Sequence, residues 1–333
     1  MKDKPPLPIR DRGGSFKINN PDDESPIKEM FTLSDGLLMI TEKCTYRMQM
    51  ADQIDPERKN PQLPPNLQQK LFDHGTKSKL LCRTLLQAKV MFRKEFQSVD
   101  INKALQLSFD ALCDLVSMEE TAKAFKTAEQ VAIDKTQNHE KQDASITIPA
   151  VGNVRGNCKS FFQKANHFTV SLINIVRLFY PEMKHKHWGD FQGLVKGQYG
   201  EIDNFYRLME LAVPFLKLIR NTRDCLEHIN LAGVETRDFE LQPDGTIAPP
   251  TIEIDFRESS QKCCSISSFM EVVTQEMQIC FEMIVVHMCS KNMQPFAGMP
   301  MTVGALSDDY QNSWHVRFAY GLYYPDGKFI PCG

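Results

Sequence analysis

The sequence predicts a mainly α-helical protein, a helical bundle with small β-hairpin additions, and hence an α-dominated α+β fold. Apolar residues recur at helical spacing in several long segments between residues 76 and 290. The alternation of apolar and polar residues that is typical of strands is confined to short stretches near both ends of the chain and around residues 236–256. Hydrophobic residues make up 42% of the 333-residue chain, which allows a sizeable core and excludes global disorder.

Charge and cysteine content narrow the class of protein. The formal net charge is −3, whereas a general nucleic-acid binder is usually strongly basic. Any RNA contact therefore has to be confined to a small part of the surface, such as a cleft or a subunit interface. The ten cysteines show no framework of a disulfide-stapled secreted domain. The first residues contain no signal-like apolar stretch, and no apolar run is long enough to cross a bilayer. We expect a soluble cytoplasmic protein with free thiols and no membrane partner.

The N-terminal part of the chain is predicted to hold little helix. Residues 1–26 are rich in Pro, Gly, Asn and charge, and we expect a flexible arm. Residues 27–75 form a small β and loop segment, in which Asp35-Gly36 marks a turn. The runs LLMIT and TYRMQM on either side of Glu42-Lys43 are typical of two short strands. The prolines in residues 52–65 predict a loop, because proline lacks a backbone donor.

Residues 76–292 are the predicted helical bundle. Its helical segments run from Thr76 to Met91 and over residues 100–132, 158–180, 205–230 and 265–290. The polar stretch 134–156 is expected to be a loop, and a short connection containing KHKHWGDFQGLVKGQYG leads to residue 205. We expect Pro214 to kink or divide the helix at 205–230.

Two β-hairpins complete the expected architecture. The first is inserted in the bundle at about residues 236–256, with Pro243-Asp244-Gly245 as its turn and TIEIDF as its second strand. The second belongs to residues 293–333, a C-terminal loop and hairpin packed on the bundle, with a turn at Pro325-Asp326-Gly327.

The helix at 205–230 ends in a tight set of charged side chains. Arg220, Asp224 and His228 are spaced i, i+4 and i+8, and they line one stripe of the predicted helix. A carboxylate one turn before a histidine can fix its tautomer, and a nearby arginine can hold a phosphate. These groups suit metal-free cleavage of RNA. An ordinary solvated helix face can contain the same pairs, each stabilising the helix by about 0.2–0.5 kcal/mol.

The run Arg223-Asp224-Cys225-Leu226-Glu227-His228 reads R-D-x-x-x-H and resembles the signature of the HEPN superfamily, an arginine and a polar residue followed by a histidine. The resemblance implies a helical bundle, a homodimer whose protomers form a cleft, and metal-independent endoribonuclease chemistry without a cofactor. It implies that His228 is the acid/base group, that Arg223 stabilises charge on the phosphate and that Asp224 orients His228. Arg220-Asn221 also resembles the R-N form of the motif as a phosphate-binding pair, although the spacing to His228 is longer, so the primary arginine stays open.

A defence or toxin-like role acting on RNA is what the resemblance suggests, and two alternatives stay open. One is a non-catalytic protein-interaction module, and the other is a binder of a nucleotide or phosphate ligand. The run from Lys184 to Trp188 combines positive charge with a ring that can stack on a base, or is plain surface. It lacks Cys or carboxylate at ligand spacing, so no zinc site is expected. Motifs of P-loop NTPases, Rossmann dehydrogenases, G-x-S-x-G hydrolases and zincins are absent.

Overall fold

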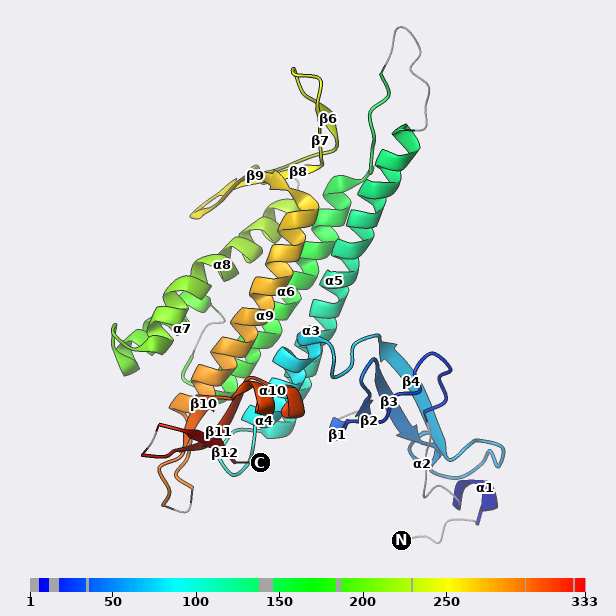
Figure 1. The fold of residues 1–333 in the computed structure, drawn as a ribbon, viewed down its shortest axis with the longest axis vertical. Coiled ribbons are helices and arrows are strands. Elements are labelled where there is room, and N and C mark those ends of the chain that lie inside the picture. The colour runs from blue at the N-terminus through cyan, green and yellow to red at the C-terminus, as the bar shows by residue number, and fades with distance from the viewer. Residues whose placement is uncertain are drawn as a thin grey trace.

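The protein has a helix-rich α+β fold with several small sheets, as the sequence predicts (Figure 1). This computed structural model describes residues 6–11, 18–33, 36–137, 146–183, 187–228, 230–296, 298–325 and 327–332, without the side chains of Ile9 and Gln137. Among these residues, none of the helices combines the length and the apolarity that a membrane span requires.

Long helices form the centre of the molecule. They are α5 (Ile101–Gln137), α6 (Val154–Phe179), α7 (Trp188–Tyr199), α8 (Asn204–Glu227) and α9 (Ile266–Lys291). In Figure 1, α5, α6 and α9 lie side by side, and α8 packs at their edge together with α7. The rings of Phe161, Phe168 and Phe281 are fully buried in the core between them. A further helical stretch precedes them and continues without interruption through α3 (Lys79–Leu81), a π-helical turn η1 (Cys82–Leu86) and α4 (Gln87–Met91).

Three helix predictions need correction. The expected connection before residue 205 contains the helix α7, because Trp188, Phe191 and Val195 bury one face of it. Helix α6 begins at Val154 rather than Cys158, within the stretch expected to be a loop. Of the two outcomes predicted for Pro214, a kink or a division, the division does not occur, because α8 is continuous through this residue. Proline removes one backbone donor, but the buried residues on either side of it keep the helix packed.

A four-stranded antiparallel sheet lies beside the lower end of α5 in Figure 1. Its order follows the sequence: β1 (Glu29–Leu33), β2 (Gly36–Ile40), β3 (Thr45–Met50) and β4 (Asn66–Phe72). The predicted strands correspond to β2 and β3, whereas β1 and β4 were not predicted. A short helix, α2 (Ala51–Ile54), occupies the start of the expected proline-rich loop. Asp35 of the predicted turn lies outside the described residues.

The expected flexible arm is anchored at two places in its described part. Arg10, in the short helix α1 (Pro8–Asp11), is buried and pairs with Asp55 at 2.6 Å and Asp52 at 3.3 Å. Asp23 is also buried and accepts hydrogen bonds from the hydroxyls of Thr41 and Tyr46. Both contacts are made with residues distant in the sequence: carboxylates pair with the charge of Arg10, and neutral hydroxyl donors solvate the carboxylate of Asp23.

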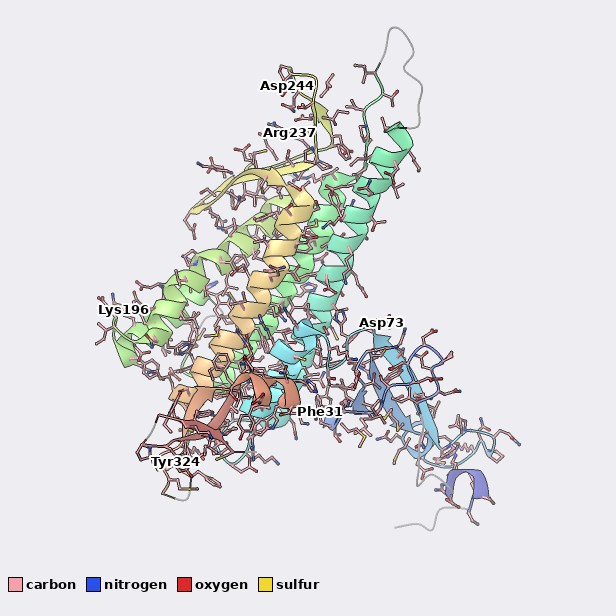
Figure 2. The ribbon with its side chains drawn as sticks, viewed as in Figure 1. Phe31, Asp73, Lys196, Arg237, Asp244 and Tyr324 are labelled. Carbon is pink, nitrogen blue, oxygen red and sulfur yellow. The ribbon has the colours of Figure 1, made fainter. Side chains whose placement is uncertain are left out.

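Small sheets lie at the two ends of the long helices (Figure 1). One sheet has the order β5-β8-β9, formed by β5 (Val234–Arg237), β8 (Thr251–Phe256) and β9 (Ser259–Ser265), and carries the two-stranded extension β6 (Glu240–Leu241) and β7 (Ile247–Ala248). The other has the order β10-β11-β12, with β10 (Thr302–Ala305), β11 (Phe318–Tyr323), β12 (Phe329–Pro331) and the helix α10 (Asp308–Trp314). Both predicted hairpins are present, and Asp326 of the second turn lies outside the described residues. Figure 2 shows Arg237 and Asp244 at the first end and Tyr324 at the other.

Candidate functional site

The predicted site lies at the C-terminal end of α8. The helix begins after Asp203, whose carboxylate accepts the backbone N–H of Phe205, and it ends at Glu227. Arg155 of α6 closes this end by donating from Nη2 to the carbonyl of Cys225 at 2.9 Å. A carbonyl in the last helical turn lacks an intrahelical partner, so this contact satisfies it and attaches α8 to α6.

Arg220 contacts a residue from another element. Its exposed side chain places Nη1 3.0 Å from Nδ1 of His187, the residue that precedes α7. The tertiary structure thereby joins the end of α8 to the histidine-rich run singled out in the sequence. Trp188 is buried and packs edge-on against Phe191, so the expectation that its ring can stack on a base is wrong. Residues 184–186 lie outside the described residues.

Arg223 and Asp224 pair with each other, with Nη1 2.8 Å from Oδ1. Between Asp224 and His228 the structure places a backbone hydrogen bond, from the N–H of His228 to the carbonyl of Asp224. The expected orienting contact from the Asp224 carboxylate to the His228 ring is not among the described hydrogen bonds. The helix ends at Glu227, and His228 follows it as the C-cap residue, with an extended backbone and an exposed side chain.

Asn221 is buried and faces β9. Its Nδ2 donates to Oγ of Ser259 at 2.8 Å, and its Oδ1 accepts a long contact from Arg257 at 3.4 Å. Position 221 lies about 100° around the helix from position 220, which turns it from the exposed stripe into the interface with the sheet. The buried Asn221 amide is thus occupied by protein groups, which does not favour its predicted phosphate-binding role.

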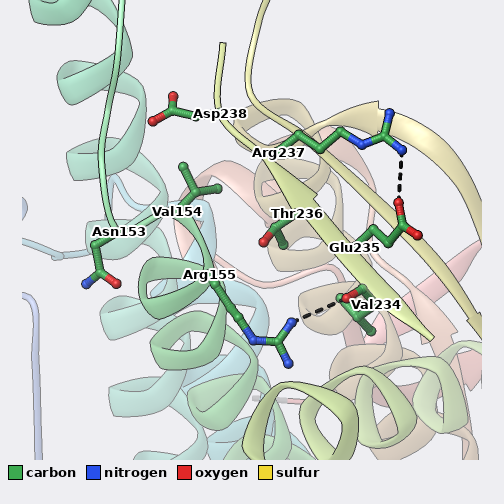
Figure 3. Close-up of a pocket in the computed structure, with 8 residues that line it drawn as sticks. All are labelled: Asn153, Val154, Arg155, Val234, Glu235, Thr236, Arg237 and Asp238. Atoms are coloured by element: carbon green, nitrogen blue, oxygen red, sulfur yellow. Dashed lines mark hydrogen bonds and ion pairs between the residues drawn. The ribbon is translucent and has the colours of Figure 1, made fainter. Parts of the chain in front are cut away.

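A cavity of about 660 Å³ lies close to this end of α8 (Figure 3). It is lined by residues 153–155 and 234–238, and none of the predicted site residues lines it. Its charged groups already have partners: Arg155 donates to the carbonyl of Val234, and Arg237 pairs with Glu235 at 2.9 Å. Asp238 accepts the backbone N–H groups of residues 151 and 152. The cavity is thus a neighbour of the predicted site and separate from it.

A second polar cluster, at the start of α3, was not anticipated from the sequence. The hydroxyl of Ser78 lies 2.7 Å from Nδ1 of His74, and Nε2 of His74 lies 3.2 Å from a carboxylate oxygen of Glu119 on α5. The H-x-x-x-S spacing before a helix is the sequence signal that could have marked His74 and Ser78. Glu119 carries no such signal, because it comes from a different helix.

Within the described ranges, no three His, Cys, Asp or Glu side chains are grouped so that they could hold a metal ion. A scan against protein-family models and searches of curated proteins and of solved structures found no match. Function is therefore inferred from the residues and contacts of this chain.

Proposed function

We propose that this protein is a HEPN-like helical bundle that acts on RNA through the C-terminal end of α8. The observation that supports the proposal is the contact between Arg220 and His187, two exposed side chains 3.0 Å apart. A guanidinium can hold a phosphate through paired hydrogen bonds, and an imidazole can exchange a proton near neutral pH. These are the two functions that metal-independent RNA cleavage requires.

The chemistry would follow an internal transfer. A histidine accepts the proton of the RNA 2′-hydroxyl, whose oxygen attacks the adjacent phosphorus and displaces the 5′-oxygen, and the leaving oxygen takes up a proton from a histidine. The products are a 2′,3′-cyclic phosphate and a 5′-hydroxyl, so no metal and no cofactor are needed. Arg220 and Arg223 would stabilise the charge that develops on the phosphate. His228 keeps the acid/base role implied by the resemblance, and His187 is a second candidate because the fold places it against Arg220.

A homodimer belongs to the same proposal, since HEPN-type sites use two protomers. Leu211 on α8 is 79% exposed, and Ile202 in the preceding turn is 83% exposed. Large apolar side chains with this exposure suit contact with another protein surface. The same observation favours the second candidate function, a non-catalytic protein-interaction module. Changing Leu211 to Glu and measuring molecular mass by light scattering tests the dimer directly.

The decisive experiment is RNA cleavage in excess EDTA. Wild type is compared with His228→Ala, His187→Ala, Arg220→Ala and Arg223→Ala, using a labelled tRNA and analysis of product ends. Arg237→Ala is the matched control, because this arginine is exposed like Arg220 and ion-paired like Arg223 but lies on the β5 strand. Cyclic-phosphate products that disappear in one histidine and one arginine variant support the ribonuclease.

Other results point elsewhere. RNA binding without cleavage, weakened by Arg220→Ala, would leave a phosphate-binding protein, the nucleotide-ligand alternative included. The absence of both binding and cleavage would reject the RNA proposal and leave the interaction module. A cytoplasmic, defence or toxin-like role is part of the proposal and stands only if the cleavage is found.

A further inference from the structure

Ser78, His74 and Glu119 form a continuous chain of polar contacts away from α8. Ser78 Oγ lies 2.7 Å from His74 Nδ1, and His74 Nε2 lies 3.2 Å from Glu119 Oε2. The His74 side chain is 13% exposed and that of Glu119 is 30% exposed, so the histidine is the more deeply buried of the two. A neutral imidazole donates from one ring nitrogen and accepts at the other. With the proton on Nε2 facing Glu119, Nδ1 is free to accept the proton of Ser78.

The position of Ser78 is unusual for a serine that begins a helix. It is the N-cap residue of the helical stretch that runs from Lys79 to Met91, yet its hydroxyl makes no capping hydrogen bond. A serine in that position ordinarily bonds a first-turn N–H. Here the hydroxyl bonds His74 instead, which leaves the first-turn N–H groups without that side-chain acceptor. Those N–H groups and the helix dipole favour negative charge next to Ser78.

A cavity gives a ligand access to this cluster. It has a volume of about 470 Å³ and lies among the start of α3, α5 and α9. Ser78 and Glu119 line it, together with Leu80 and Ala122 as apolar positions and Thr274 and Gln278 as polar ones. The size admits a small organic molecule with a short apolar group.

We propose that Ser78 is the nucleophile of an acyl-transfer site, with His74 as its general base and Glu119 as the residue that positions His74. The substrate class is a small carboxylic ester. This activity is independent of the proposed action on RNA, because the two sites share no residue. The chain has no G-x-S-x-G motif, in which a sharp strand-to-helix turn presents the serine. In this proposal Ser78 is presented at the N-terminus of a helix instead.

The reaction balances without a further reagent except water. Ser78 Oγ forms a bond to the ester carbonyl carbon while its proton moves to His74 Nδ1, and the carbonyl π electrons move to the oxygen. Collapse of this intermediate breaks the bond to the alcohol oxygen, which takes the proton from His74. Water then attacks the acyl carbon while His74 accepts its proton, the bond from that carbon to Ser78 Oγ breaks, and Oγ takes the proton back from His74 as the carboxylic acid leaves. The first-turn N–H groups of Lys79 and Leu80 are the donors available to the oxyanion.

The electrostatic surroundings suit a histidine base. Burial lowers the pKa of His74, while the carboxylates of Glu119, Glu120 and Asp73 act to raise it and Lys123 acts to lower it further. The net shift below the ordinary value keeps the ring neutral and able to accept a proton at pH 7. Lys123 also lies 2.8 Å from the Glu119 oxygen that faces His74, so the carboxylate is shared between the two.

Covalent labelling tests the nucleophile without relying on any variant. The full-length protein is incubated with a fluorophosphonate, and the adduct is located by intact mass and peptide mapping. We expect a single adduct on Ser78, absent in Ser78→Ala and unchanged in Ser307→Ala. Ser307 is a matched control because it is also an N-cap serine without a side-chain capping bond. An unlabelled wild-type protein, or an adduct confined to another residue, would overturn the proposal.

Hydrolysis of p-nitrophenyl acetate tests the roles of the other two residues. We expect the rate to fall at least about 100-fold in Ser78→Ala and His74→Ala. Glu119→Gln is expected to lower the rate less and to shift the rising limb of the pH profile downward, because the neutral amide no longer favours protonated His74. A rate in Ser78→Ala equal to wild type excludes the nucleophile, and an unchanged pH profile in Glu119→Gln excludes the positioning role. Failure here leaves the RNA proposal untouched, since that assay depends on α8.

Discussion

Arg220 and His187 lie 3.0 Å apart, although they are separated by 33 positions in the sequence. The contact joins the end of α8 to the residue before α7, and the two helices pack along each other between these points. The exposed arginine therefore has a defined neighbour rather than a free range of rotamers. A preorganised guanidinium loses less conformational entropy when it binds a phosphate.

Arg220→Ala should weaken binding of single-stranded RNA by about tenfold, or about 1.4 kcal/mol, through loss of a phosphate contact. The slope of log affinity against log salt concentration should become shallower by about 0.7, because one fewer counterion site is neutralised. Fluorescence anisotropy across a salt series measures both quantities. Arg237→Ala, on the β5 strand, should change neither. An unchanged slope for Arg220→Ala would remove this arginine from the RNA contact.

Asn221→Ala should destabilise the protein by about 1–3 kcal/mol, because Ser259 would lose its buried hydrogen-bond partner. RNA affinity per folded molecule should stay as in wild type, since the Asn221 amide faces β9. Urea unfolding and anisotropy on the same samples separate the two effects. Asn230→Ala, at an exposed position after the helix, serves as the control for stability. Lost affinity at unchanged stability would restore Asn221 to the phosphate site.

Asp114 on α5 should make stability fall as pH rises. Burial raises the pKa of its carboxyl to about 6, against the attraction of Lys164 at 3.8 Å. The folded state therefore binds the proton more tightly than the unfolded state does. The stability contributed by the neutral form is complete below the unfolded pKa, near 3.8, and is lost as pH rises through about 6. At pH 8, keeping the Asp114 carboxylate charged in the folded protein lowers the free energy of unfolding by about 3 kcal/mol.

Asp114→Asn is expected to remove that cost. The variant should be more stable than wild type at pH 8 and similar to it at pH 4, as measured by urea unfolding at both values. Asp134→Asn is the matched control, because this aspartate is exposed and lies about five turns later on the same helix. A variant that is less stable than wild type at pH 8 would contradict the assignment and would make the pair with Lys164 the dominant interaction.

Arg317→Met should destabilise the attachment of the C-terminal sheet. Arg317 Nε donates to Oε1 of Glu282 at 2.9 Å, and Nη2 contacts the other oxygen of that carboxylate, which has no exposed surface. Removing one partner of a buried pair costs about 3–5 kcal/mol, and a value near the lower limit is expected because Arg317 is partly exposed. Thermal unfolding and limited proteolysis near residue 317 measure the effect.

The double variant Glu282→Gln with Arg317→Met distinguishes the cause. It should regain part of the lost stability, because no unpaired carboxylate remains in the core. A double variant as unstable as the sum of both single variants would show that packing, and not the buried charge, holds the sheet in place.

The spacing of apolar residues within a segment was sufficient to predict an element where one face of that element is strongly apolar. Helix α9 was predicted at residues 265–290 and observed at Ile266–Lys291, because buried residues recur along its whole length. Helix α7 was missed because Gly189, Gly193 and Gly197 lower its intrinsic helix propensity. The space around all three is open, so they face away from the packed side. Strand β9 was missed because Ser259–Ser265 has no apolar alternation, and pairing with β8 makes it a strand.

The sequence by itself determined the α+β class, the position of the longest helices and the concentration of charged groups at the end of α8, because each depends on spacing within one segment. Only the tertiary structure decided that Asn221 turns inward, that Asp224 holds Arg223, and that Arg220 meets His187. It alone brought Glu119 to His74 and Ser78. Asn221, Arg220 and His74 each meet a partner from an element far away in the chain, and the geometry of these contacts follows from how buried faces pack, which local spacing does not encode.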